Sequence, residues 1–426
     1  RIVRVLSGGA GQGIHTDEPV IILADDLAPS ETVQLEKDKV LSFVTVHGSV
    51  NSHTAILART MSIPALIGTD VALDETVDGK FAIVDGTNGV LYVEPDEETL
   101  ETMRRRQREE QEKKELLQTL KGRETVTLDG KKIRLYANIG NSKDLASVIQ
   151  NDAAGIGLFR SEFLYLEKET FPTEEEQFQV YKQVAETMAG KPVIIRTLDI
   201  GADKQIGYFD LPKEDNPAMG MRALRICLTR PEIFKTQLRA LFRASAFGKL
   251  GIMFPMVTSV WEVREAKRMC EEVRRELKNE GFPYSEDVQI GIMIETPAAA
   301  INSDRLAKEV DFFSIGTNDL TQYTLAADRT LGSVANYQTA WHPAVLRAIK
   351  MICDAGNAKG MPVGVCGEAA ADPDLAVVLA GLGVNSLSMT PVALDDVRAS
   401  LAEVTFEEAQ ARAEAALNGD FYHPAN

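Results

Sequence analysis

The sequence predicts an α/β protein in which a C-terminal (β/α)8 barrel follows a small α/β domain and a linker helix. Three observations support this fold class. Eight short apolar runs follow residue 122, and several are separated by helical patterns, such as those at 223–247 and 258–280. These runs occupy about 290 residues, which is a usual length for such a barrel. A charged stretch at 96–121 separates them from an N-terminal region of different composition.

The N-terminal region, residues 1–95, mixes short apolar runs with glycine-rich turns. Residues 19–24 and 80–84 are apolar runs of the kind that form buried strands. Between them, residues 54–61 have a helical pattern. We therefore expect a small α/β domain here.

Residues 96–121 predict a solvated helix that links two domains. Glu101 and Arg105 are spaced i,i+4 with the acid first, as are Glu109 and Lys113, and this order stabilises a helix. No large apolar residue lies between Met103 and Leu116, so the helix has little surface to bury. A nucleic-acid-binding cluster is the alternative, but the acids between the basic residues argue against it.

The eight apolar runs predict the strands of the barrel. They are 133–137, 155–159, 193–196, 252–256, 290–294, 312–315, 363–366 and 386–389. Near-continuous apolar strands indicate a parallel sheet that is covered on both faces. We expect the barrel to span residues 122–416 and a C-terminal tail to follow at 417–426. An open doubly wound sheet is the alternative.

Composition excludes several classes of protein. The 426 residues carry a formal net charge of −17, which disfavours binding to nucleic acid or to an anionic membrane surface. No apolar run is long enough to span a membrane. The four cysteines include no CxxC pair, so neither a disulfide framework nor a zinc site is predicted. This use of cysteine fits a reducing compartment, and we expect a cytoplasmic protein.

Polar residues end most of the predicted barrel strands, where active residues lie in this fold. Arginine binds phosphate and carboxylate in a bidentate manner, and a Glu and an Asp from neighbouring strands suit Mg²⁺. A small phosphorylated acid would fit both. The alternatives are salt-bridge arginines, a turn at Glu295 and a buried structural thiol at Cys366. The strand-end positions are Asn138, Arg160, Arg196 with Asp199, Glu295, Asn318 with Asp319, Cys366 with Glu368, and Met389, and Arg329 follows in a loop.

His53 is a candidate nucleophile in the N-terminal region. Asn51 or Ser52 is a suitable N-cap, which places His53 in the first turn of a helix. The positive end of the helix dipole disfavours the imidazolium and stabilises an anion attached to the ring. A histidine that accepts a phosphoryl group needs both properties. A histidine that only belongs to a capping turn is the alternative. We expect structural roles for the other histidines (His15, His47, His342, His423) and for Cys227, Cys270 and Cys353.

Several segments resemble one family, the phosphoenolpyruvate-protein phosphotransferases, which are enzyme I of the bacterial sugar phosphotransferase system. The segment 312–326, FFSIGTNDLTQYTLA, followed by Asp328-Arg329, is similar to the phosphoenolpyruvate (PEP) signature of that family. The segment 52–59, SHTAILAR, resembles its phosphohistidine motif. Further blocks at 157–164, 196–201, 295–300 and 366–368 match, and the resemblance covers residues from about 20 to 415.

The resemblance implies a role for each matching residue. It implies that His53 accepts the phosphoryl group and that Cys366 protonates the departing enolate to give pyruvate. It implies that Mg²⁺ is bound by Glu295 and Asp319. The residues implied to bind PEP are Arg160, Arg196, Arg222, Asn318, Asp319 and Arg329. The resemblance also implies a phosphohistidine domain that swivels, the phosphocarrier protein HPr as the partner, and a homodimer through the barrels.

The chain departs from the family pattern before His53 and in one barrel loop. Gly48, Ser49, Val50 and Asn51 replace the usual Gly-Gly, basic or polar residue and Thr, and the loss of a basic side chain at Val50 is expected to weaken contact with the phosphoryl group. Ala202 replaces a glycine. Of the family's helical HPr-binding domain, we expect only a trailing segment near residues 1–6.

Two other functions remain open on these residues. One is the C-terminal portion of a PEP synthase or pyruvate phosphate dikinase, which also joins a phosphohistidine to a PEP-binding barrel. The sequence carries no sign of the ATP-binding domain that those enzymes need. The other is a regulatory component that binds PEP without turning it over.

Overall fold

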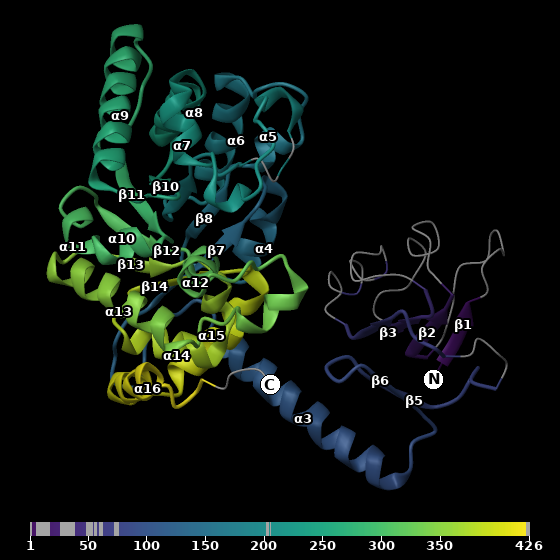
Figure 1. Ribbon diagram of the computed structural model, residues 1–426. Helices are drawn as coiled ribbons and strands as arrows, with labels where there is room; N and C mark the ends of the chain where they lie inside the picture. The colour runs from purple at the N-terminus through teal and green to yellow at the C-terminus, as the bar shows by residue number, and fades with distance from the viewer. Residues whose placement is uncertain are drawn as a thin grey trace. The chain divides into compact units, whose positions relative to one another are not determined.

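A computed structural model describes residues 2–5, 18–25, 39–47, 54, 58, 63–71, 76–201, 204 and 206–422 (Figure 1). The chain divides into two compact units, Arg1–Glu115 and Leu116–Asn426, and we describe each by itself. The predicted limits of the two domains and the linker, at 1–95, 96–121 and 122–416, remain predictions. In the parts of the chain that the structure describes, no helix combines the length and apolar composition that crossing a membrane requires.

The first unit contains a parallel four-stranded sheet and a hairpin. The sheet has the order β1-β2-β3-β4, and the antiparallel hairpin consists of β5 and β6. The strands are β1 (Ile2–Val5), β2 (Val20–Ala24), β3 (Val40–Thr45), β4 (Ala65–Ile67), β5 (Ala82–Asp85) and β6 (Val90–Val93). Both predicted strands are present, although β5 begins two residues later than expected. Of the predicted helix at 54–61, the described residues Thr54 and Ala58 are helical and buried.

The sheet of the first unit is buried on both faces. Side chains of β2 alternate between two apolar clusters, because successive residues of a strand point to opposite faces. Val20 and Ile22 pack with Ala58 in one cluster, whereas Ile21 and Leu23 pack with the hairpin side in the other. This burial explains why β2 is apolar along its whole length.

Helix α3 (Glu97–Leu120) extends from the first unit across the boundary between the units. Its residues from Arg104 to Glu112 are exposed, as their charge predicts. Arg105 and Glu109 form an i,i+4 pair, with 4.0 Å between Nε and Oε1.

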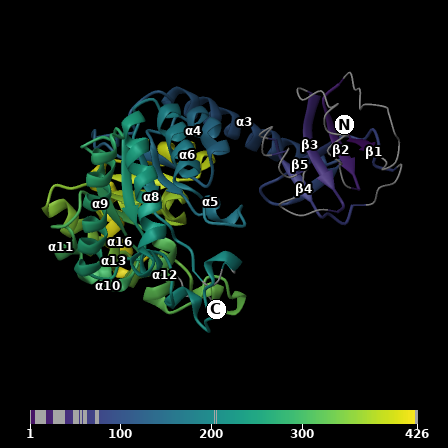
Figure 2. The same cartoon turned by 90° about the horizontal axis from the view of Figure 1, so that it is seen from above.

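The second unit is the predicted barrel (Figures 1 and 2). Eight parallel strands close in the order β10-β11-β12-β13-β14-β7-β8-β9, and the pairing of β14 with β7 completes the ring. The strands are β7 (Arg134–Ile139), β8 (Ile156–Arg160), β9 (Val193–Arg196), β10 (Leu250–Phe254), β11 (Gln289–Ile294), β12 (Phe312–Ile315), β13 (Val363–Val365) and β14 (Ser386–Met389). All eight predicted strands are confirmed, so the open doubly wound sheet is wrong.

The helices of this unit surround the strands (Figure 2). They are α4 (Leu145–Gln150), α5 (Phe163–Leu166), α6 (Glu174–Thr187), α7 (Leu224–Thr229), α8 (Pro231–Ala244), α9 (Val260–Glu280), α10 (Pro297–Ile301), α11 (Ser303–Leu306), α12 (Thr317–Leu325), α13 (Pro343–Ala358), α14 (Pro373–Gly381), α15 (Leu394–Ala402) and α16 (Phe406–Asn418). Capping boxes begin α6, α9 and α16, in which a Thr or Ser side chain and a Glu three residues later satisfy the free N–H groups.

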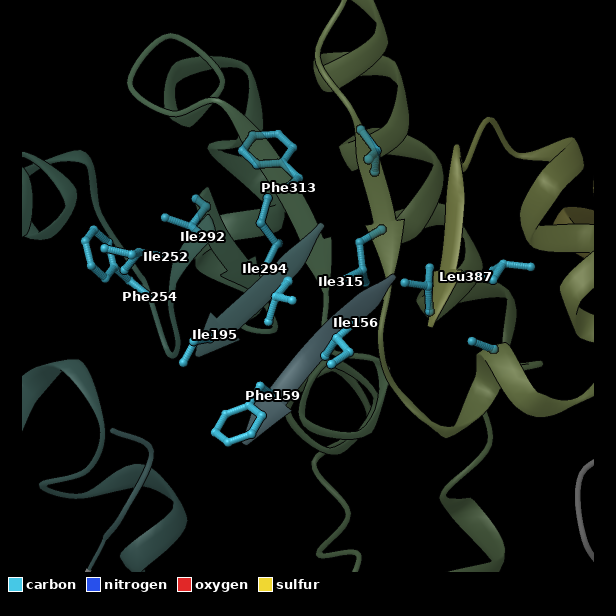
Figure 3. Close-up of a cluster of buried hydrophobic side chains, with 14 of the residues drawn as sticks. Ile156, Phe159, Ile195, Ile252, Phe254, Ile292, Ile294, Phe313, Ile315 and Leu387 are labelled. Carbon is cyan, nitrogen blue, oxygen red and sulfur yellow. The ribbon is translucent and has the colours of Figure 1, made fainter. Parts of the chain in front are cut away.

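The main core lies between the strands and the helices. It is formed by outward-facing strand residues such as Ile195, Ile252, Ile292, Phe313 and Leu387 (Figure 3). A smaller cluster of Leu158, Met253, Met293, Phe312 and Cys366 forms a second apolar group on the strands and at the start of the turn after β13.

The fourth barrel strand ends two residues earlier than the predicted 252–256. Pro255 lacks an N–H for the ladder, and Met256 adopts a left-handed conformation with φ of 56°. This turn directs the Met256 N–H to the carboxylate of Glu295, with 2.7 Å between N and Oε1. Because the backbone leaves the strand here, the Met256 N–H bonds to Glu295, a residue of the candidate site.

Candidate active site

Arg160 and Arg196 end two neighbouring barrel strands. They are paired in register on β8 and β9, so both guanidinium groups start from the same end of the barrel. The side chain of Arg196 is 11% exposed. Its two terminal nitrogens bond to different carboxylates, with 3.0 Å from Nη2 to Glu162 Oε1 and 3.0 Å from Nη1 to Asp199 Oδ2. Its buried Nε has no partner among the described residues.

Arg222 joins the same network from the loop before α7. A backbone bridge to Gly201 holds this position. Arg222 Nη2 lies 3.0 Å from Asp199 Oδ1, and Nη1 lies 3.3 Å from Asp319 Oδ1 and 3.2 Å from the Tyr323 hydroxyl. Asp199 therefore bridges Arg196 and Arg222. The two arginines hold the pKa of Asp199 below its ordinary value, against the opposing effect of its burial.

Glu295 and Asp319 lie in this network as a pair of buried carboxylates. Glu295 is 1% exposed and Asp319 is 5% exposed. Burial raises the pKa of Glu295 well above its ordinary value, and the negative charges of Asp319 and Asp199 raise it further. Gly316 makes room for this carboxylate, because a Cβ atom there would lie 2.7 Å from Glu295 Oε2.

The same pair is the place where a cation would fit best. Among the described residues, no three His, Cys, Asp or Glu side chains form a group that could hold a metal ion. Mg²⁺ commonly takes only one or two carboxylates and completes its shell with water and substrate oxygens. The mutual repulsion that raises the pKa of Glu295 would be relieved by a divalent cation, so the donor set fits the predicted ion.

Asn318 lies in the first turn of α12, and Arg329 lies in the loop after this helix. The Asn318 side chain accepts a hydrogen bond from the Glu368 N–H at 3.1 Å. Arg329 is held at its backbone, where its N–H donates to Gln322 Oε1 at 3.0 Å. Its guanidinium is 43% exposed and lies 3.9 Å from Asp319 Oδ2, so it contacts the site while remaining open to solvent.

Cys366 lies directly after β13 and is 2% exposed. Burial raises the pKa of its thiol to about 11, although Arg196 and Arg160 act in the opposite direction. Its carbonyl accepts a hydrogen bond from Asn138 Nδ2 at 2.9 Å, and Ser388 Oγ donates to Asn138 Oδ1 at 2.5 Å. The thiol is therefore held in its protonated form at neutral pH.

The structure thus brings together most of the predicted site residues. Arg160, Arg196, Arg222, Glu295, Asn318, Asp319, Arg329 and Cys366 lie at or beyond the C-terminal ends of the barrel strands. Met389, in contrast, belongs to the main apolar core.

His53 lies outside the described residues, as do Val50, Asn51 and Ala202. Two other histidines have evident contacts. His47 Nδ1 lies 2.8 Å from Asp25 Oδ1, and His342 caps α13 by accepting from the Ala344 N–H. Cys227, Cys270 and Cys353 are buried in helices, as expected.

Sequence reasoning assigned no role to Glu162, Tyr323 or Gly316. Glu162 follows the strand-end Arg160 by two residues, which is a usable signal for a second charged position near the site. Tyr323 lies one helical turn after Asp319, and that spacing places both on one face of α12. The steric role of Gly316 depends on a contact with another strand, so no local pattern reveals it.

Comparisons with known proteins match both units. A family model described as "PEP-utilising enzyme, PEP-binding domain" matches residues 114–406, and one described as "PEP-utilising enzyme, mobile domain" matches residues 16–89. A phosphoenolpyruvate-protein phosphotransferase of Staphylococcus carnosus is 48% identical over 400 residues, covering 93% of this chain and 70% of the relative. One of Haemophilus influenzae is 46% identical over 400 residues, covering 94% of this chain and 70% of the relative.

One solved structure that resembles part of the chain is an NMR solution structure of an enzyme I protein. The matched region is 38% identical in sequence and covers 22% of this chain and 39% of the chain in that structure, with a TM-score of 0.22.

Proposed function

We propose roles for the residues of a chain that belongs to the PEP-utilising enzymes and, within them, to the phosphoenolpyruvate-protein phosphotransferases, or enzyme I. The activity is phosphoryl transfer from PEP in the sugar phosphotransferase system. The observation that best supports our assignment of residues is the buried network that joins Arg196, Arg222 and Asp319.

We infer that the arginines bind the two anionic groups of PEP. Arg160, Arg196 and Arg329 would hold the phosphate and the carboxylate, and Arg222 and Asn318 would add further contacts. Phosphoryl transfer depends mainly on positioning and on stabilising charge, so a site rich in cations suits it. Arg196 and Arg222 are already held in place by Asp199, which reduces the entropy that they would lose on binding the substrate.

Glu295 and Asp319 would hold Mg²⁺. The bound ion would neutralise negative charge on the substrate oxygens. Glu295 is supported in this role by its hydrogen bond from the Met256 N–H, which fixes one carboxylate oxygen and leaves the other, Oε2, beside Gly316.

Cys366 would protonate the enolate that forms when the phosphoryl group leaves. In this step the bond between the phosphorus and the enol oxygen of PEP breaks, and a bond forms between the phosphorus and a ring nitrogen of His53. The enolate takes the thiol proton at its methylene carbon and becomes pyruvate, and the thiolate then recovers a proton from water. A thiol whose pKa is raised to about 11 by burial is present as the proton donor at neutral pH.

His53 would carry the phosphoryl group to HPr, and a homodimer through the barrels would be the working form. These proposals rest on the phosphohistidine motif at 52–59 and on family membership.

Labelling with PEP tests the assignment of the nucleophile. With Mg²⁺ and PEP labelled on phosphorus, we expect a label on the chain that is stable in alkali and labile in acid. His53→Ala should remove this label. His47→Ala is the matched control in the same unit and should keep it, because His47 is engaged with Asp25.

Two results would contradict the proposal. A label that persists in His53→Ala would place the nucleophile elsewhere. Labelling of His53 by ATP would instead favour the chemistry of a PEP synthase or dikinase.

A further inference from the structure

A cavity of about 1070 Å³ opens at the N-terminal end of the barrel, opposite the candidate active site. Its lining includes residues at or just before strand starts, such as Lys132 and Lys249, and residues of the barrel interior, such as Gly157 and Gly251. Pockets that bind small ligands commonly measure about 300–1000 Å³, so this cavity is large enough for one. The proposed phosphoryl transfer makes no use of it.

The cavity exists because small residues occupy the barrel interior at this end. Gly157, Gly251, Gly364, Ser386 and Ser388 all line it, whereas bulky branched side chains usually fill such a barrel.

Two glycines on adjacent strands show where space remains. At Gly291 the Phe312 ring takes the room of a side chain, since a Cβ atom there would lie 2.3 Å from it. At Gly251 a Cβ atom would have its nearest neighbours, on Ile194 and Phe312, at 3.5 Å. A side chain at position 251 would therefore enter the cavity without a clash at its Cβ.

The charged residues of the lining are nearly balanced, with five basic side chains (Arg123, Lys132, Arg134, Lys249, Arg398) and four acidic ones (Glu124, Asp152, Asp287, Asp311), so the case for an anion rests on which basic groups lack an acidic partner. Lys132 is paired with Glu124 at 2.6 Å, and the carboxylates of Asp152 and Asp311 accept backbone N–H groups. In contrast, Arg134 and Lys249 form no ion pair with any residue that the structure describes. Arg134 instead contacts Tyr136, whose pKa is raised by burial although the guanidinium acts in the opposite direction.

We propose that this cavity binds a small organic anion with an apolar or aromatic body. The anionic group would pair with Arg134, because a guanidinium binds carboxylate or sulfonate oxygens through two parallel N–H groups. The body would pack against Gly251, Ile194 and Phe312, which together form an apolar wall.

The site would not be isolated from the chemistry at the other end of the barrel. Ser388 belongs to the cavity lining and also donates to Asn138, which in turn bonds the carbonyl of Cys366. A ligand that reaches Ser388 would contact the first member of this chain of hydrogen bonds.

Titration of the full chain with 8-anilinonaphthalene-1-sulfonate, a fluorescent aromatic sulfonate, tests the proposal. We expect saturable binding of one probe per chain, which excess PEP does not displace. Arg134→Gln should weaken binding about tenfold or more, since it removes a charge-assisted contact. Lys132→Gln is the matched control on the same rim and should change binding less than about twofold, because Lys132 already has a carboxylate partner.

Gly251→Leu should abolish binding by placing a side chain in the cavity. The melting temperature and circular dichroism of Gly251→Leu must show a folded barrel. If Gly251→Leu does not fold, the proposal is tested by Arg134→Gln alone. Displacement of the probe by PEP, absence of saturable binding, or equal affinities for Arg134→Gln and Lys132→Gln would each overturn the proposal.

Discussion

Gly316→Ala tests the position of Glu295 by steric contact alone. Gly316 has φ of −87° and ψ of 85°, outside the left-handed region that disfavours other residues. An added Cβ atom would lie 2.7 Å from Glu295 Oε2, 3.0 Å from Glu295 Cβ and 3.0 Å from Met293 Sδ. The substitution therefore pushes on the proposed Mg²⁺ ligand without changing any charge.

The structure sets the size of the expected effect. Ordinary van der Waals contact of a Cβ atom begins at 3.4 Å, so the carboxylate must retreat by roughly 0.7 Å from its 2.7 Å approach. Overpacking of this kind costs about 1–3 kcal/mol of stability. A displacement near 1 Å in a catalytic group lowers the rate by as much as ~100-fold. We expect the rate of phosphorylation by PEP to fall roughly 10- to 100-fold, and more at low Mg²⁺.

The assay is the initial rate of pyruvate release at several Mg²⁺ concentrations. Gly251→Ala is the control, because it makes the same change in the same barrel, but its new Cβ atom meets nothing closer than 3.5 Å. We expect this control to keep wild-type kinetics. If Gly316→Ala also kept its rate and its Mg²⁺ dependence, Glu295 would not be a ligand whose position matters.

Four further predictions concern the proposed proton donor, one arginine and the proposed metal. Cys366→Ala should slow pyruvate release about 10²- to 10⁴-fold, as loss of a general acid does, while PEP affinity measured by calorimetry stays near the wild-type value. Because burial raises the pKa of Cys366 to about 11 in the folded state, the free energy of unfolding of the wild type should fall as the pH rises from ~8.5 toward that value. Urea unfolding at several pH values measures this fall, which should be smaller in Cys366→Ala. Arg222→Lys should raise the KM for PEP about tenfold or more, because one ammonium group cannot span Asp199, Asp319 and Tyr323; an unchanged KM would remove Arg222 from the site. Removal of Mg²⁺ with EDTA should weaken PEP binding at least about tenfold, and restored Mg²⁺ should recover it; equal affinity in both conditions would exclude the ion from substrate binding.

Most of the barrel could be predicted from sequence because its strands are apolar on both faces and recur with helices between them. The residues at which strands end were harder to predict. The predicted 252–256 ran two residues too far, because the apolar residues Pro255 and Met256 continue the hydrophobic pattern although their backbone has already turned. Periodicity detects burial, and Met256 is buried although its backbone has left the strand and donates its N–H to Glu295.

The site residues also fall into two groups, those that a local sequence pattern reveals and those that it does not. Arg160, Arg196 and Glu295 could be found because each interrupts an apolar pattern where a parallel strand ends. The pairing of Arg222 with Asp199 and Asp319 could not be found in this way, because Arg222 is 23 residues from Asp199 and 97 residues from Asp319 in the sequence. Such contacts depend on how the loops fold over the barrel.

The structure also changes the balance of charge in the site. The sequence suggested arginines opposed by two carboxylates, Glu295 and Asp319. Glu162 and Asp199 add two more, so four arginines (Arg160, Arg196, Arg222 and Arg329) meet four carboxylates. The protein's own charges therefore nearly cancel, and the arginines alone provide no excess to hold a trianion in a poorly solvated site. A divalent cation would supply most of what the substrate requires, and the proposed Mg²⁺ would then be a condition for tight PEP binding as well as for the chemistry.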